Sequence, residues 1–146
     1  MLRTRIGQGV LVDVPATTAN LGPGFDCLGA ALALSNRFEL RVIDGGPERF
    51  ELIIEGPEGS HLRGGPDNLV YRSAQRVWRE AGEEPVALEA RVQLAVPPAR
   101  GLGSSATSIV AGLTVNRYDD RSPDRANENG CEAGCTVHPA GTLTVT

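Results

Sequence analysis

The stretch that most constrains the fold is an alternating run followed at once by a turn of small residues. In residues 86–96 the apolar side chains fall at every second position, which predicts a β-strand with one buried face. The turn after it reads Pro97-Pro98-Ala99-Arg100-Gly101-Leu102-Gly103-Ser104-Ser105-Ala106-Thr107. Residues 105–113 then favour a buried helix. The stretch therefore predicts a strand, a tight turn and a helix in succession.

This turn has the chemistry of an anion site. Small residues let the backbone approach a ligand closely. The start of a helix presents N–H groups and a partial positive charge, which suit a phosphate. Ser104 and Ser105 add hydroxyls that can hold a phosphate oxygen or Mg²⁺. The alternative, left open here, is a purely structural turn in which a serine caps the helix.

Two common phosphate loops do not fit the turn. A Walker A loop requires a lysine, and the 14 basic residues of this chain are all arginine. A dinucleotide-binding turn has a third glycine, whereas Ser-Ser-Ala follows Gly101 and Gly103 here. A phosphate site at this turn must therefore be of a third kind.

A second small-residue stretch, residues 15–29, reads Pro-Ala-Thr-Thr-Ala-Asn-Leu-Gly-Pro-Gly-Phe-Asp-Cys-Leu-Gly. Asn20 and Asp26 are the polar groups in it that could bind the amine or hydroxyl of a small substrate. The alternative is that they form local Asx turns. We expect residues 16–26 to be an ordered loop that follows a strand at residues 9–14 and the stop at Pro15.

The middle of the chain alternates between strand and helix patterns. Residues 27–34 fit either a strand or a short helix. Residues 38–42 and 50–54 both alternate and, joined by Gly45-Gly46-Pro47, predict an antiparallel hairpin. Asp67 or Asn68 can cap a helix that ends at Gly82. One face of that helix is apolar, and its arginines lie largely on the other.

The character of the chain changes after residue 113. Residues 114–146 contain one leucine, against 14 in residues 1–113, and show no helical period. Such a segment buries little apolar surface to offset chain entropy. We expect a domain at residues 1–113 and a tail at 114–146 that is poorly ordered, out of frame or foreign. Cys131, Cys135 and His138 lie close in sequence there, either as a metal cluster or by accident of spacing.

Composition narrows the function classes. With 146 residues and 40% hydrophobic content, the chain suits one domain with its own core. A net charge of −4 gives no basic surface for nucleic acid. No apolar run approaches the roughly 20 residues of a membrane span, and no signal-peptide pattern appears. Three cysteines make no disulfide framework. We therefore expect a cytoplasmic protein without nucleic-acid or membrane partners.

Three separated motifs resemble the GHMP small-molecule kinases in order and spacing. They are residues 15–29, Pro66-Asp67-Asn68-Leu69-Val70 and residues 97–106, and the resemblance covers about residues 8–113. The first motif is most similar to that of the homoserine kinases. The resemblance implies an α/β (α+β) fold, the ribosomal-S5-like N-terminal domain, here incomplete. It also implies transfer of the γ-phosphoryl of ATP to the side-chain hydroxyl of L-homoserine, in threonine biosynthesis.

The same resemblance implies roles for individual residues. Residues 97–107 would wrap the ATP phosphates, with Ser104 or Ser105 helping to hold Mg²⁺. Asn68 and Leu69 would lie near the adenine. Asn20 and Asp26 would lie at the homoserine site, with Asp26 facing the substrate amino group. The resemblance assigns no catalytic base here.

The chain also departs from that family. The acidic Mg²⁺ ligand, the third glycine-rich motif and the substrate-binding arginines of the family do not appear after Leu113. We therefore expect impaired catalysis and weak nucleotide binding. A different acceptor alcohol, a non-catalytic nucleotide-binding module and a non-functional fragment remain alternatives. A homodimer is compatible with the sequence.

Overall fold

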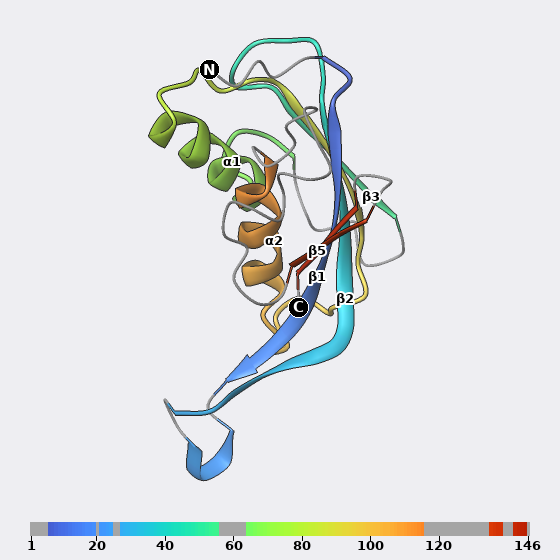
Figure 1. The fold of residues 1–146 in the computed structure, drawn as a ribbon, viewed down its shortest axis with the longest axis vertical. Helices are drawn as coiled ribbons and strands as arrows, with labels where there is room; N and C mark the ends of the chain where they lie inside the picture. The colour runs from blue at the N-terminus through green and yellow to red at the C-terminus, as the bar shows by residue number, and fades with distance from the viewer. Residues whose placement is uncertain are drawn as a thin grey trace.

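The computed structural model describes residues 6–19, 21–24, 27–55 and 64–115, together with the backbone of residues 135–138 and 142–145. Two helices, α1 (Leu69–Glu80) and α2 (Ser104–Leu113), lie on the same face of a mixed β-sheet (Figure 1). The expected α/β (α+β) fold class is confirmed.

The sheet has the strand order β3-β4-β2-β1-β6-β5. Its strands are β1 (Gly9–Ala19), β2 (Gly29–Val42), β3 (Phe50–Glu55), β4 (Leu88–Gln93), β5 (Cys135–His138) and β6 (Thr142–Val145). Strand β1 pairs antiparallel with β2 and parallel with β6. Strand β4 pairs antiparallel with β2 and parallel with β3.

The predicted hairpin of residues 38–42 and 50–54 is wrong. Both segments are strands, but β4 lies between them. The parallel pair of β3 and β4 is joined through α1, a crossover that carries the apolar face of the helix onto the sheet. Alternation shows that a strand has one buried face, but it does not identify the neighbouring strand.

Strands β1 and β2 are longer than expected. Strand β1 continues through Pro15 to Ala19, with a register shift between Pro15 and Thr17, so residues 16–19 are strand and not loop. Pro15 is tolerated because the pairing of β1 with β6 covers only residues 11–13, so no strand in the described part of the chain pairs with the second edge of β1 at Pro15. The open choice for residues 27–34 resolves to strand, because β2 begins at Gly29.

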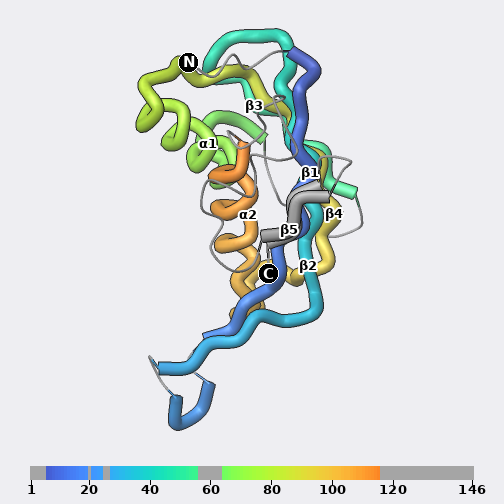
Figure 2. The backbone as a smooth tube through the Cα atoms, viewed as in Figure 1, coloured from blue at the N-terminus to red at the C-terminus, as the bar shows by residue number. Residues whose placement is uncertain are grey.

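Beyond the helices, the paired ends of β1 and β2 extend as a two-stranded arm (Figures 1 and 2). A short 3₁₀ helix, η1 (Gly22–Gly24), lies near its tip. The arm carries the first of the three motifs away from the sheet.

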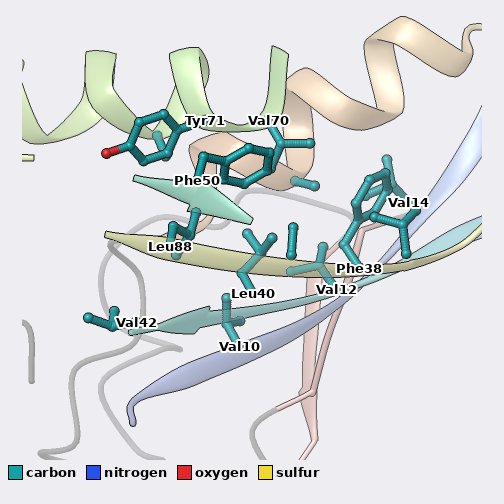
Figure 3. Close-up of a cluster of buried hydrophobic side chains, with 14 of the residues drawn as sticks. Val10, Val12, Val14, Phe38, Leu40, Val42, Phe50, Val70, Tyr71 and Leu88 are labelled. Carbon is teal, nitrogen blue, oxygen red and sulfur yellow. The ribbon is translucent and has the colours of Figure 1, made fainter. Parts of the chain in front are cut away.

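The core lies between the helices and the inner face of the sheet, as the alternation predicts. Figure 3 shows this cluster, which includes Val12, Phe38, Leu40 and Leu88, each at most 1% exposed. Helix α1 adds Tyr71 and Trp78, whose rings meet edge to face with centroids 6.3 Å apart. Helix α1 agrees with the expected range, and its N-cap is Asn68.

For the tail, the structure describes β5 and β6 at the edge of the sheet beside β1. Residues 116–134, 139–141 and 146 lie outside the described residues. The separation into a domain and an atypical tail therefore stays a prediction.

Candidate phosphate-binding site

The turn between β4 and α2 has an unusual backbone. Three of its residues have positive φ: Ala99 at 57°, Gly101 at 72° and Gly103 at 71°. Glycine adopts this left-handed region freely, but for alanine it costs about 1–2 kcal/mol. Strained residues of this kind gather at ligand sites, where the surrounding structure holds them in place.

The turn delivers the first residues of α2 to the surface. Gly103 is the N-cap and makes no side-chain capping bond, so the expectation that a serine caps this helix is wrong, while a purely structural turn stays an alternative. The first amide of the regular helical ladder is that of Thr107, which donates to the Gly103 carbonyl over 3.0 Å. The preceding N–H groups, of Ser104, Ser105 and Ala106, have no carbonyl within the helix to bond. Ser105 and Ala106 are exposed. This helix start can therefore receive an anion.

The turn contacts the base of the arm directly. The Thr17 amide of β1 donates to the Leu102 carbonyl over 3.1 Å. A Cβ placed on Gly103 would lie 2.5 Å from Thr17 Oγ1, so the glycine allows the close approach. The structure thus brings together the first and third motifs through Thr17 and Leu102, which are 85 positions apart in sequence.

Asn36 is a residue of this region that sequence reasoning missed. Its side chain is fully buried on the inner face of β2. Its Oδ1 accepts hydrogen bonds from the amides of Ala95 and Val96, and its Nδ2 donates to Thr107 Oγ1. A polar residue at an inward-facing position of an alternating strand was the available signal.

The second motif lies at the other end of α2. Asn68 Oδ1 accepts from the Val70 amide over 3.0 Å, so this side chain caps α1. Leu69 is 39% exposed at the start of the helix. Gly112, in the last turn of α2, lies so close to Val70 that an added Cβ would overlap the Val70 carbonyl oxygen. Asn68 and Leu69 are therefore near the end of α2 and away from the turn at its start.

Of the remaining predicted site residues, the structure describes the serines of the turn but not the polar residues of the arm. Asn20 and Asp26 lie outside the described residues, although the arm that carries them is described on both sides. Ser104 and Ser105 occupy the first turn of α2. Their role as hydroxyl ligands stays a prediction. In the part of the chain that the structure describes, no group of three His, Cys, Asp or Glu side chains gathers to hold a metal ion. The side chains of Cys131, Cys135 and His138 lie outside it.

A groove of about 480 Å³ lies on the outer face of the sheet, away from the helices. Its polar and charged groups bond to one another: Arg37 donates to both carboxylate oxygens of Asp13, over 2.7 and 2.8 Å, and Gln93 donates to Glu55. The bond to Asp13 raises the pKa of Arg37. The side chains of the groove therefore use their hydrogen-bonding groups on one another.

No helix in the described ranges is long and apolar enough to cross a membrane.

Comparison with known proteins agrees with this geometry. The family model for the N-terminal domain of GHMP kinases matches residues 68–141. Homoserine kinases of Synechococcus sp. strains CC9902 and CC9311 are 82% and 80% identical to this chain over 113 residues. That match covers 77% of this chain and 36% of each relative, so the chain spans about a third of their length.

A solved structure gives the same result for the fold. The crystal structure of homoserine kinase from Cytophaga hutchinsonii matches with a TM-score of 0.62 and 29% sequence identity. The match covers 82% of this chain and 39% of that one. From its strand-turn-helix geometry, its motifs and these matches, we conclude that the chain belongs to the GHMP kinase family.

Proposed function

We propose that this chain forms the nucleotide-binding part of a homoserine kinase and holds the phosphates of ATP at residues 97–107. The observation that carries this proposal is the turn with positive φ at Ala99, Gly101 and Gly103, which opens α2 toward solvent. The homoserine kinases that match at 80% identity or more support the acceptor, L-homoserine.

The proposed site suits phosphoryl transfer, which depends mainly on positioning and on neutralising charge. The amides of Ser104, Ser105 and Ala106 would donate to phosphate oxygens, and the dipole of α2 favours their negative charge. Arg100 is exposed in the same turn and adds a cation. A Mg²⁺ ion bound with the nucleotide would supply further neutralisation, and the Ser104 and Ser105 hydroxyls are the oxygens of this turn that fit it.

The acceptor site is proposed on the arm, at Asn20 and Asp26. The bond between Thr17 and Leu102 supports this placement, because it fixes the base of the arm against the phosphate-binding turn. An alcohol held on the arm would then face the phosphates. The resemblance implies that Asn68 and Leu69 lie near the adenine, and both lie close to the C-terminal end of α2. We therefore propose that the adenine lies toward that end. We assign no catalytic base, and we place the protein in the cytoplasm and in threonine biosynthesis.

Calorimetric titration with a non-hydrolysable ATP analogue tests the nucleotide site. We expect weak, saturable binding that the double change Ser104→Ala with Ser105→Ala weakens, because it removes both hydroxyls of the turn. The matched control is Ser35→Ala, which removes an exposed hydroxyl from the outer face of β2. Equal binding by the double variant and the control would refute the site.

An ADP-release assay tests the reaction. We expect little or no turnover with L-homoserine, because the chain spans 36% of the relatives that it matches. A rate like that of a full-length homoserine kinase would contradict this expectation. Turnover with another alcohol in a substrate panel would favour a different GHMP kinase, and binding without turnover of any alcohol would favour a non-catalytic module.

A further inference from the structure

Asn36 is a polar residue buried at a position where the neighbouring side chains are apolar. It faces the apolar core from β2, opposite Val14 in the strand pair, and its side chain is 0% exposed. Burying an amide is unfavourable unless its polar atoms are hydrogen-bonded. A residue needed only for packing would be apolar here, as Phe38 and Leu40 are on the same face.

The partners of Asn36 lie on both sides of the phosphate-binding turn. Before the turn, Oδ1 accepts from the Ala95 and Val96 amides over 2.9 and 2.8 Å. After the turn, Nδ2 donates to Thr107 Oγ1 over 3.0 Å. One side chain therefore connects the chain entering the turn with the helix leaving it.

The connection continues into the first turn of α2. The Thr107 hydroxyl is 1% exposed and donates to the Ser104 carbonyl over 2.7 Å. It accepts from Asn36 and donates to Ser104, so its single proton and one lone pair are both used. This chain of bonds runs from β2 to the residue whose amide is offered to the anion.

We propose that Asn36 is the positioning residue of the phosphate-binding turn and acts through Thr107. By holding residues 95–96 and Thr107 at a fixed separation, it sets the direction of the Ser104, Ser105 and Ala106 amides. It does not touch the phosphates itself. This inference rests on the proposed function, because it assumes that the turn binds a nucleotide.

Two substitutions at Thr107 separate positioning from packing. Thr107→Val keeps the shape and removes the hydroxyl, whereas Thr107→Ser keeps the hydroxyl and removes a methyl group. We expect Thr107→Val and Asn36→Leu each to weaken binding of the ATP analogue by about tenfold or more, the scale of a lost buried hydrogen bond. Thr107→Ser should stay within about twofold of the unchanged protein, since its hydroxyl can make the same bonds.

Val42→Ala provides the stability control. It removes buried methyl groups from the last residue of β2, six residues from Asn36. We expect it to lower the free energy of unfolding without changing affinity for the analogue. The variants should have the same order of affinity for inorganic tripolyphosphate, which lacks the nucleoside. If Thr107→Val binds the ATP analogue as tightly as Val42→Ala does, the proposal is overturned.

Hydrogen exchange keeps the test separate from the proposed function. In Thr107→Val and Asn36→Leu, we expect the amide of residue 107, which donates to the Gly103 carbonyl, to exchange about tenfold faster or more, while those of α1 are unchanged. If the unchanged protein does not bind the ATP analogue, the proposed function is wrong. The exchange rates then still test whether Asn36 positions the turn. Unchanged exchange of the residue 107 amide would overturn it. If Asn36→Leu does not fold, Thr107→Val gives the result.

Discussion

Two neighbouring glycines of the turn should respond very differently to the same substitution. Gly101 and Gly103 have nearly equal backbone angles, with φ of 72° and 71°. A Cβ on Gly101 would meet no atom within 4 Å. A Cβ on Gly103 would lie 2.5 Å from Thr17 Oγ1 and 3.1 Å from the Thr17 carbonyl oxygen. The contact with β1 therefore distinguishes them.

The expected magnitudes follow from this difference. Placing alanine in the left-handed region costs about 1–2 kcal/mol, and the less flexible unfolded chain returns about 0.4–1 kcal/mol. Both terms are common to Gly101→Ala and Gly103→Ala. Overpacking against Thr17 adds about 1–3 kcal/mol for Gly103→Ala alone. The free energy of unfolding should therefore be lower for Gly103→Ala than for Gly101→Ala by that amount.

Urea unfolding followed by tryptophan fluorescence measures this difference. Trp78 is the only tryptophan of the chain and is 0% exposed, so its emission reports on unfolding. Adding Thr17→Ala to Gly103→Ala should restore part of the loss, because Oγ1 is the nearer of the two contacts. Equal stability of the two glycine variants would refute the contact between the turn and β1.

Three further changes test other parts of the structure. Gly112→Ala should lower the free energy of unfolding in urea, because its Cβ overlaps the Val70 carbonyl; a gain of stability, as helix propensity alone predicts, would contradict the close packing of α1 and α2. Asn68→Ala should cost about 1 kcal/mol in the same assay through loss of the cap, and Asn68→Asp should retain most of it; equal losses would contradict capping. Burial raises the pKa of Tyr71, so the folded state favours the neutral phenol. Its contribution to stability is present below the ordinary tyrosine pKa of 10.0 and is lost as pH rises through the higher folded value. Ultraviolet titration should show a tyrosine that ionises late in the folded protein and is absent in Tyr71→Phe; ionisation at the ordinary pKa would contradict burial.

Much of the fold can be predicted from local pattern. Residues 69–80 form a helix because their apolar side chains share one face and Asn68 caps it. The alternation in residues 88–93 identifies β4 and its buried face. These signals are local, since they depend on side chains within one element.

What the sequence did not predict depends on contacts between distant segments. The apparent hairpin is broken because β4, which comes some 30 residues after β3, pairs between β2 and β3. Pro15 suggested a strand end, but its position beyond the pairing with β6 allows β1 to continue. Neighbouring strands are chosen by tertiary packing, which no period of two or of 3.6 encodes.

The candidate site shows the same division. Positive backbone angles in the turn could be expected from Gly101 and Gly103, but not from Ala99. Asn36 could be noticed only as a polar residue on an otherwise apolar face. Its bonds to residues 59, 60 and 71 positions away became evident only in the folded chain.

The central claim is that residues 97–107 bind the phosphates of ATP. Calorimetric titration of the chain with the non-hydrolysable ATP analogue, in parallel with the Ser104→Ala, Ser105→Ala double variant, tests it most directly. The account predicts saturable binding to the unchanged chain and weaker binding to the variant, which lacks both hydroxyls. Binding that persists undiminished in a folded double variant would contradict the claim.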